Sequence, residues 1–324
     1  MLSLKEIQAP VAEHIVKFED TFRSSMKSRV PLLDQITHYI MKRKGKQIRP
    51  LFVFLSASVT GGINEKTYRA AAMIELLHTA SLVHDDVVDD SNLRRGYFSI
   101  NALWKNKISV LVGDFLLSKG LLLSLENNDY QLLQLVSNAV REMSEGELLQ
   151  IEKARRLDIE EKIYFEIIRK KTASLIASCC ACGCASSGAD QETIEKMRLF
   201  GEYTGIAFQI KDDLFDYESG NSTGKPSAID IKDRKMTLPL IYLLNHSGFS
   251  EKRWIVNTVK NHNTDPDRVS ELIVKISESG GITYAREKML GYRQMAINLL
   301  SEFPENIYRH SLEQLVIFTT ERNK

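Results

Sequence analysis

The chain has 324 residues, of which 43% are hydrophobic and 26% charged, an ordinary composition for a globular protein with a deep core. Its 43 Lys and Arg residues against 42 Asp and Glu residues leave a net charge of +1. This balance argues against a nucleic-acid binder held by a general basic surface. No proline occurs between Pro50 and Pro226, so residues 51–225 lack the strongest helix breaker and favour long helices.

Apolar periodicity predicts an all-α fold. In the segment 66–90, residues such as Ile74 and Leu77 recur at helical rather than strand intervals. Clusters of Gly, Asn and Pro separate the periodic segments, and we find no useful strand pattern, fixed-period repeat or flexible linker. We therefore expect one domain, residues 1–324, with ten or more helices. The predicted helices include 66–90, 108–126, 129–152, 160–186, 191–218, 240–246, 250–261, 267–278, 282–301 and 305–322.

Neither a targeting segment nor a transmembrane segment is expected. Charged residues interrupt the apolar residues of the first twenty positions, unlike the core of a signal peptide. The longest uncharged run, 172–189, is rich in Ser, Cys, Ala and Gly, and it predicts a tightly packed core helix. All four cysteines lie in this run without zinc-binding spacing, so we expect no disulfides and a reducing, cytoplasmic location.

Two acidic strings stand out because each contains the pattern D-D-x-x-D. Their carboxylates are Asp85, Asp86 and Asp89 in the first string, and Asp212, Asp213 and Asp216 in the second. Helix positions i and i+4 are neighbours, so each string is predicted to gather its carboxylates on one face, where they repel. A solvated acidic surface is one interpretation. The large apolar residues that flank both strings favour a cation partner, and clustered carboxylates suit Mg²⁺.

Basic residues accompany these strings along the chain. They are Lys46, Arg49, Arg94, Arg95, Lys171, Lys225 and Lys235. Any one of them alone is better explained as a solvated side chain. Guanidinium and ammonium groups are nevertheless the usual partners of phosphate, so the whole set indicates a site for Mg²⁺ and anionic oxygens.

The motifs occur in a characteristic order. They are G-K-Q-I-R-P (45–50), E-L-L-H (75–78), D-D-V-V-D-D-S-N-L-R-R-G (85–96), G-D-F (113–115), G-E-L-L-Q (146–150), K-T-A (171–173) and G-I-A-F-Q-I-K-D-D-L-F-D (205–216). This ordered set resembles the trans-isoprenyl diphosphate synthases, the polyprenyl synthase family, over nearly the whole chain. The resemblance implies the isoprenoid synthase fold, a helical bundle around a deep central cavity. Two positions where glycine is common in the family hold Ala228 and Arg234 here.

The resemblance also implies an activity: Mg²⁺-dependent head-to-tail (1′-4) condensation of isopentenyl diphosphate with an allylic diphosphate such as farnesyl diphosphate. It assigns about three Mg²⁺ ions to the aspartates of the two motifs. The implied metal ligands are Asp85, Asp86, Asp89, Asp212, Asp213 and Asp216. The implied catalytic residues are Asp85, Asp86, Asp89, Lys171, Thr172, Gln209 and Asp212, with Thr172 and Gln209 near the carbocation.

Two groups of basic residues would hold the two diphosphates. Those implied for the allylic diphosphate are Arg94, Lys171, Lys225 and Lys235. Those implied for isopentenyl diphosphate are Lys46, Arg49, His78 and Arg95, with Arg322 or Lys324 closing over it. His78 is alternatively a satisfied core histidine.

Product length depends on residues beneath the first motif, where the product of this family grows. Ser81 and Ala80 lie one helical turn below Asp85, about 6–7 Å away. Their small size leaves the tunnel open, and Leu77 and Phe115 are deeper candidates for its floor. We predict a hexaprenyl to nonaprenyl product, with octaprenyl the central expectation. If Ala80 and Ser81 serve only helix packing, the product is farnesyl or geranylgeranyl diphosphate.

Rival interpretations and the assembly also follow from the motifs. A terpene cyclase usually lacks a second complete D-D-x-x-D and needs no isopentenyl site. A non-catalytic synthase subunit tends to lose the acidic motifs, which are intact here.

The family suggests a homodimer, and helix 108–126 has the apolar surface for one. A long prenyl chain would suit the side chain of a quinone.

Overall fold

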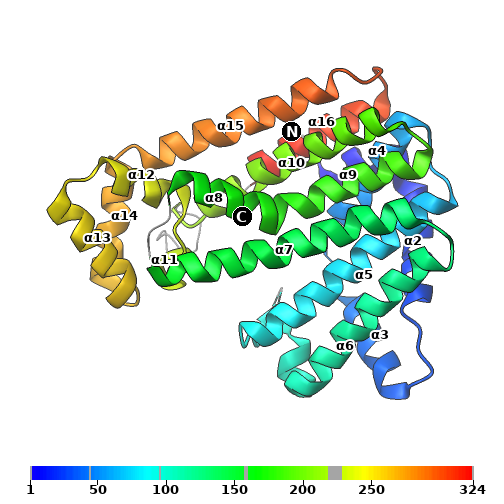
Figure 1. The fold of residues 1–324 in the computed structure, drawn as a ribbon, viewed down its shortest axis with the longest axis horizontal. Helices are drawn as coiled ribbons and strands as arrows, with labels where there is room; N and C mark the ends of the chain where they lie inside the picture. Colours follow the sequence, from blue (N-terminus) through cyan, green and yellow to red (C-terminus); the bar gives the residue numbers. More distant parts are fainter. Residues whose placement is uncertain (1, 44, 95, 157–159, 218–227, 323–324) are drawn as a thin grey trace.

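The computed structural model describes residues 2–43, 45–94, 96–156, 160–217 and 228–322, with the backbone alone for Arg155 and Arg156. These residues form an all-α fold, which confirms the predicted class. Figure 1 shows α7, α10 and α15 running lengthwise, with α11–α14 gathered at one end of the molecule and α2, α3 and α6 at the other.

The helices and strands follow one another with short connections. In chain order they are α1 (Leu4–Gln8), the 3-10 helix η1 (Ala9–Val11), α2 (Ala12–Ser25), α3 (Pro31–Lys42), α4 (Ile48–Thr60), α5 (Glu65–Val88), β1 (Leu93–Arg94), β2 (Tyr97–Phe98), α6 (Ile100–Leu125), α7 (Tyr130–Arg156), α8 (Glu161–Ile168), the π-helix η2 (Arg169–Ala173), α9 (Ser174–Ser187), α10 (Gln191–Leu214), α11 (Ile229–Lys232), α12 (Leu238–His246), α13 (Phe249–Asn261), α14 (Pro266–Glu278), α15 (Gly281–Leu300) and α16 (Ile307–Glu321).

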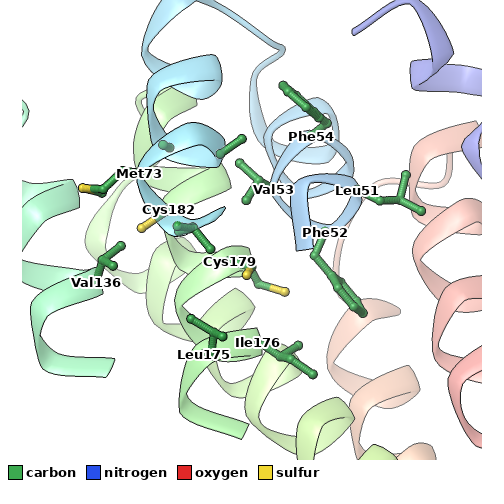
Figure 2. Close-up of a cluster of buried hydrophobic side chains, with 14 of the residues drawn as sticks. Leu51, Phe52, Val53, Phe54, Met73, Val136, Leu175, Ile176, Cys179 and Cys182 are labelled. Atoms are coloured by element: carbon green, nitrogen blue, oxygen red, sulfur yellow. The ribbon is translucent and has the colours of Figure 1, made fainter. Parts of the chain in front are cut away.

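The larger hydrophobic core forms where α9 packs between α4, α5 and α7 (Figure 2). Small residues make this packing possible, because a Cβ on Gly183 of α9 would lie 2.4 Å from the backbone oxygen of Val53 in α4. The predicted tightly packed core helix is therefore confirmed. Its four cysteines are free and buried, and burial raises the pKa of Cys179 to about 12, so this thiol stays protonated and unreactive.

A second core cluster lies at the other end of the molecule. It combines α8 and α12–α14 with the C-terminal half of α10 and the N-terminal part of α15. The opposite parts of α10 and α15 belong to the larger core. These two long helices therefore connect the clusters, and the end of α10 that carries the second acidic motif lies against the smaller cluster.

Several predicted element boundaries need correction. The segment 160–186 is not one regular helix, because the π-helical turn η2 separates α8 from α9. The helix predicted for 191–218 ends at Leu214, and the one predicted to begin at 108 begins at Ile100. The two short strands β1 and β2 pair as an antiparallel hairpin where no strand was expected. Helices α1–α4 were not among the predicted elements.

Helix α6 has an unusual exposed apolar surface. Among the described residues it is the one helix long and apolar enough to cross a membrane, judged by length and composition, and 33% of its most apolar window is buried. Core helices pass the same test, so this property alone does not identify a membrane span. Large apolar side chains of α6 that face solvent include Leu103, Val110, Leu111, Leu122 and Leu125.

Candidate active site

The first acidic motif lies at the C-terminal end of α5. Asp85 and Asp89 are exposed, whereas Asp86 is 3% exposed. Oδ1 of Asp86 accepts a hydrogen bond from Nε of Arg94 at 2.8 Å, and it lies 2.8 Å from Nη2 of the same guanidinium in an ion pair. The three carboxylates of this motif therefore differ in exposure, although the charge of Asp89 acts on both Asp85 and Asp86. Consecutive residues of a helix differ by about 100° in direction, so Asp86 turns inward where Asp85 turns outward.

The β1–β2 hairpin places Arg94 beside Asp86. Arg94 pairs with Tyr97 across the hairpin, and the hydroxyl of Tyr39 in α3 donates to the backbone oxygen of Phe98 at 2.7 Å. These contacts turn the chain back toward the end of α5. Arg95, the other arginine predicted for this segment, lies outside the described residues.

The second acidic motif is also divided between exposed and buried carboxylates. Asp212 is exposed, while Asp213 is buried and accepts hydrogen bonds from Tyr164 at 2.7 Å and Gln209 at 2.8 Å. Burial, and then the charge of Asp230, raises the pKa of Asp213 to about 7. Asp216 is buried after the end of α10, where it accepts from the backbone amide of Asp230. One carboxylate of this motif is therefore open to ligands.

The π-helical turn η2 lies between the two motifs and presents Lys171 and Thr172. Lys171 forms an ion pair with Glu147 of α7, and its ammonium lies 3.4 Å from Oε1 of Gln150. Thr172 donates from Oγ1 to Oε1 of Gln209 on α10 at 2.8 Å. The turn thus bridges α7 and α10.

Glycines allow these neighbours to approach the turn closely. A Cβ on Gly146 of α7 would lie 2.8 Å from the backbone nitrogen of Lys171. A Cβ on Gly205 of α10 would lie 2.5 Å from the Cα of Ala173. Contacts this short do not occur in folded proteins, so both positions require glycine for the observed packing.

Lys171 connects the two acidic motifs electrostatically. Neighbouring protein atoms displace part of the water around Asp85, which raises its pKa although the residue stays exposed. The charge of Glu147 raises this pKa further, whereas the ammonium of Lys171 lowers it. Lys171 also lines a cavity of about 130 Å³ together with Asp212, Asp213 and Lys235. Lys235 is paired with Asp230, another lining residue, and its ammonium lies 3.2 Å from Oδ1 of that carboxylate. Lys225, predicted beside this group, lies outside the described residues.

Some residues of this region were not singled out from the sequence. Glu147 and Gln150 lie in the motif G-E-L-L-Q, which carried a recognisable signal but no assigned role. Tyr164 carried no signal at all, because only the folded chain brings α8 against Asp213.

Arg322 occupies a position that differs from the expected one. Its Nη2 donates to Oδ1 of Asp212 at 2.6 Å, and its guanidinium carbon lies 4.3 Å from the ring centroid of Phe208. The family resemblance implies a place for Arg322 over isopentenyl diphosphate. The structure instead places it against the exposed carboxylate of the second motif.

The residues expected to bind isopentenyl diphosphate lie on or before α4 and on α5. Arg49 lies 3.4 Å from Oε1 of Glu75, one helical turn before His78 on α5. Lys46 lies before α4 with its ammonium 5.9 Å from the ring centroid of Phe318 in α16. Arg49 is therefore close to the turn that carries His78, and Lys46 faces the C-terminal helix.

The expected chain-length residues occupy the α5–α6 contact. Ala80 and Leu77 are each 3% exposed, and a Cβ on Gly120 of α6 would lie 3.1 Å from Cγ of Leu77. Ser81 is half-buried, and its hydroxyl donates within α5 to the backbone oxygen of His78 at 2.8 Å. Phe115 of α6 is also half-buried.

The exposed carboxylates fit a divalent metal that keeps other ligands. Within the described ranges, no three His, Cys, Asp or Glu side chains converge as a ready-made metal cage. Charges of both signs surround Asp85: Glu147 and Asp89 raise its pKa, whereas Lys171 and Arg94 lower it. Mg²⁺ typically binds one or two carboxylates and completes its shell with water and phosphate oxygens, which matches an open donor set of this kind.

An all-α bundle with two acidic motifs separated by a cationic turn defines a class of helical enzymes that act on diphosphates. The family model described as "Polyprenyl synthetase" matches residues 30–276. The chain therefore belongs to the polyprenyl synthetase family and is a prenyltransferase, a trans-polyprenyl diphosphate synthase. Enzymes of this family use isopentenyl and allylic diphosphates together with divalent metals.

Named relatives cover the chain from end to end. It is 34% identical to the all-trans-nonaprenyl-diphosphate synthase (geranyl-diphosphate specific) of Rhodobacter capsulatus over 98% of both chains. It is 31% identical to the octaprenyl diphosphate synthase of Escherichia coli (strain K12) over the whole of both chains.

Solved structures with the same fold include enzymes of different product length. A decaprenyl diphosphate synthase from Rhodobacter capsulatus has a TM-score of 0.92 at 30% identity, over 98% of this chain and 99% of that one. A polyprenyl synthase from Caulobacter crescentus CB15, complexed with calcium and isoprenyl diphosphate, has a TM-score of 0.89 at 32% identity, over 99% and 98%. A geranylgeranyl pyrophosphate synthase from Bacteroides thetaiotaomicron has a TM-score of 0.83 at 36% identity, over 98% and 99%.

Proposed function

We propose that this chain condenses isopentenyl diphosphate with an allylic diphosphate, such as farnesyl diphosphate, head to tail (1′-4) in a Mg²⁺-dependent reaction. The product is a long all-trans polyprenyl diphosphate, hexaprenyl to nonaprenyl in length and octaprenyl as the central expectation. One observation carries the proposal. Lys171 stands between the two acidic motifs, where its charge acts on Asp85 and its side chain lines the cavity beside Asp212.

The exposed carboxylates are the natural metal ligands in this proposal. Asp85, Asp89 and Asp212 would hold about three Mg²⁺ ions together with the diphosphate oxygens. The bound metal supplies Lewis-acid stabilisation of the negative charge on the leaving diphosphate. Asp86, Asp213 and Asp216 are buried and hydrogen-bonded. We propose that these three carboxylates hold in place the residues that surround the metal site.

Basic residues hold the allylic diphosphate and stabilise the charge that develops on it. Lys171 and Lys235 line the cavity, and Arg94 is paired with Asp86 of the first motif. When the C1–O bond breaks, the diphosphate keeps the electron pair and an allylic cation remains. Cations already in place near the departing oxygens stabilise the negative charge that develops there. They lower the activation barrier of this step without having to move. Lys225 has the same proposed role from sequence resemblance.

The carbocation would lie near Thr172 and Gln209. Their side chains are already hydrogen-bonded to each other, so the Thr172 hydroxyl proton points to Gln209 and its oxygen lone pairs remain available to a cation. The double bond of isopentenyl diphosphate forms the new carbon–carbon bond with C1 of the allylic group. A proton then leaves C2 of the isopentenyl unit, and the released diphosphate accepts it.

Isopentenyl diphosphate is assigned to Lys46, Arg49 and His78, with Arg95 added from sequence resemblance. The Arg49–Glu75 pair supports this assignment, because it holds a guanidinium near the His78 turn of α5. The planar guanidinium group of Arg49 can donate two parallel hydrogen bonds, which suits bidentate contact with a diphosphate. Arg322 remains a candidate to close the site, from its position on Asp212.

Small side chains at Ala80 and Ser81 support the long product. A bulky residue at this turn of α5 would fill the space directly below the first motif, and neither residue is bulky. The shorter-chain alternative rests on a specific observation, the 36% identity to a geranylgeranyl pyrophosphate synthase. A long prenyl chain would serve as the side chain of a quinone.

The assembly and location belong to the same proposal. Exposed apolar side chains along α6 support a homodimer that buries this helix. The four free cysteines support a reducing location, which we take to be the cytoplasm. The contribution of α10 and α15 to both core clusters supports a single domain over residues 1–324.

The deciding experiment is product chromatography after incubation with isopentenyl and farnesyl diphosphates and Mg²⁺. A dominant product between hexaprenyl and nonaprenyl diphosphate supports the proposal, and a dominant geranylgeranyl product overturns the long-chain part. Diphosphate release without isopentenyl diphosphate favours a terpene cyclase, and no turnover by the purified protein favours a non-catalytic subunit.

Matched variants test the proposed metal ligands. We expect Asp85→Asn to reduce turnover on the order of 10²-fold or more, because it removes a charge that stabilises the transition state. Asp20→Asn is the control, since Asp20 is an exposed carboxylate on α2, remote in sequence from both motifs. Equal activity of the two variants would contradict the assignment.

A further inference from the structure

Three hydrogen bonds join four side chains that line the cavity beside Lys171. The hydroxyl of Tyr164 donates to Oδ2 of Asp213 at 2.7 Å, and Nε2 of Gln209 donates to Oδ1 of the same carboxylate at 2.8 Å. Oε1 of Gln209 in turn accepts from Oγ1 of Thr172 at 2.8 Å. This hydrogen-bonded row therefore connects α8, through α10, to the π-helical turn η2.

The middle of the row decides which way the hydroxyl of Thr172 points. A glutamine amide can present either its oxygen or its nitrogen to a given neighbour. An ionised carboxylate only accepts hydrogen bonds, so Asp213 selects the orientation in which Gln209 presents Nε2 to it. Oε1 then faces Thr172, whose hydroxyl must donate. In the reversed orientation Nε2 would donate to Thr172, and the hydroxyl proton would point elsewhere.

Tyr164 holds the carboxylate that makes this selection. Tyr164 is 4% exposed and Asp213 is 7% exposed, so water competes little for either group. A buried carboxylate oxygen without a donor costs free energy, and the phenol of Tyr164 supplies the donor for Oδ2. With one donor on each oxygen, the carboxylate cannot turn without losing a hydrogen bond. Its plane, and with it the position of Oδ1 against Gln209, is therefore fixed.

We propose that Tyr164 is a positioning residue for the condensation: through Asp213 and Gln209, it keeps the oxygen lone pairs of Thr172 directed at the allylic cation. Lone pairs stabilise an adjacent positive charge, whereas a hydroxyl proton aimed at it would repel it. The inference rests on the proposed function, because it requires a cation beside Thr172. That cation forms only as the C1–O bond breaks, so loss of the positioning should slow this step without weakening substrate binding.

Tyr164→Phe tests the role, because it removes the hydroxyl and keeps the buried ring. We would measure single-turnover condensation of farnesyl and isopentenyl diphosphates at saturating Mg²⁺, since product release can limit kcat. At about pH 9 the carboxyl of Asp213, whose pKa is raised to about 7, is ionised. The rate constant should fall about tenfold, and the half-saturating concentrations of both substrates should stay within about twofold of wild type.

Substitutions of Thr172 separate positioning from a general structural effect. If Tyr164 acts through the hydroxyl of Thr172, Tyr164→Phe should change the rate less than about twofold in the Thr172→Val background, where that hydroxyl is absent. In the Thr172→Ser background, which keeps a hydroxyl, the effect of about tenfold should return. A structural defect would slow the reaction by the same factor in both backgrounds.

Tyr284→Phe is the matched control. The hydroxyl of Tyr284 on α15 also donates to a carboxylate, that of Glu161, at 2.8 Å from Oε1 and 2.9 Å from Oε2. Neither residue is among those that line the cavity. This variant should keep the wild-type rate, and thermal unfolding verifies that both tyrosine variants are folded at the assay temperature.

The outcomes distinguish this inference from the proposed function. An inactive wild type would overturn the proposed function and the inference together. With an active wild type, the inference alone is overturned if Tyr164→Phe keeps the wild-type rate, or if it mainly raises the half-saturating concentrations. An undiminished effect of Tyr164→Phe in Thr172→Val overturns it as well, and so does an equal loss of rate in Tyr284→Phe.

Discussion

Arg322 donates a hydrogen bond to Asp212 at 2.6 Å, although 110 residues separate the two in the sequence. The guanidinium also lies over the ring of Phe208, so the C-terminal arginine is held by charge and by stacking. The same pattern recurs throughout the candidate site, where cations expected to hold diphosphate are paired with carboxylates. These pairs are Arg94–Asp86, Lys171–Glu147, Lys235–Asp230 and Arg49–Glu75.

The Arg322–Asp212 pair predicts a competition with the metal. Replacing the arginine in Arg322→Gln removes a cation from an exposed carboxylate, a contact worth about 0.5–1 kcal/mol. We expect the Mg²⁺ concentration for half-maximal turnover to fall about two- to fivefold. Steady-state rates across a Mg²⁺ series measure this, and Arg322→Lys, which keeps the charge, is the control. An unchanged or higher Mg²⁺ requirement would contradict the competition.

The buried carboxyl of Asp213 predicts a pH dependence of stability. Its pKa is raised to about 7 in the folded protein from 3.8 in the unfolded chain, first by burial and then by the charge of Asp230. A raised pKa means that the folded state binds the proton more tightly, so this contribution is complete below about pH 4 and is lost as the pH rises to about 7.

Asp213→Asn removes this titration. Between about pH 8 and about pH 5, the wild-type free energy of unfolding should rise relative to that of the variant. Urea unfolding in EDTA at both pH values measures the difference. Parallel behaviour of the two proteins would mean that Asp213 does not titrate in this range.

Ala80 predicts control of product length. The residue is 3% exposed on α5, one turn below Asp85, so Ala80→Phe should place a ring under the first motif and shorten the product by several isoprene units. Ala80→Val should give an intermediate distribution. Chromatography of the products measures both, with thermal unfolding as the check on folding. An unchanged distribution in Ala80→Phe would mean that this face does not line the product path.

Gly205 predicts a packing requirement beside η2. A Cβ there would lie 2.5 Å from the Cα of Ala173, so Gly205→Ala must displace α10 from the turn that carries Thr172. We expect a loss of stability of about 1–3 kcal/mol and reduced turnover. Gly291→Ala on α15 is the matched control, because a Cβ there meets nothing within 4 Å.

The control should gain about 0.5–1 kcal/mol, the usual advantage of alanine over glycine inside a helix. Chemical denaturation of both variants measures the two changes. Similar effects in the two variants would show that the close approach of α10 to η2 is not the cause.

Local sequence patterns were sufficient for part of the structure. Apolar periodicity predicted most helices after residue 61, and the small residues around Cys182 predicted the packed core helix α9. Ala228 and Arg234 were recognised as family glycine positions, and both have left-handed backbone angles, with φ of 53° and 58°. The π-helical turn was not predictable, because its geometry follows from the close packing of Gly146 and Gly205 against it.

The sequence by itself determined the all-α class, the positions of both acidic motifs and the family, because helical periodicity is a local property and motif order is read directly along the chain. Only the tertiary structure decided which carboxylates face solvent and which cation pairs with each. Burial of Asp213 requires Tyr164 from α8, and pairing of Asp212 requires Arg322 from the C-terminus. Those contacts depend on how helices that are distant in the sequence pack together. Burial and ion pairing then set the pKa of each carboxyl group, and so whether it carries a negative charge that can bind a metal.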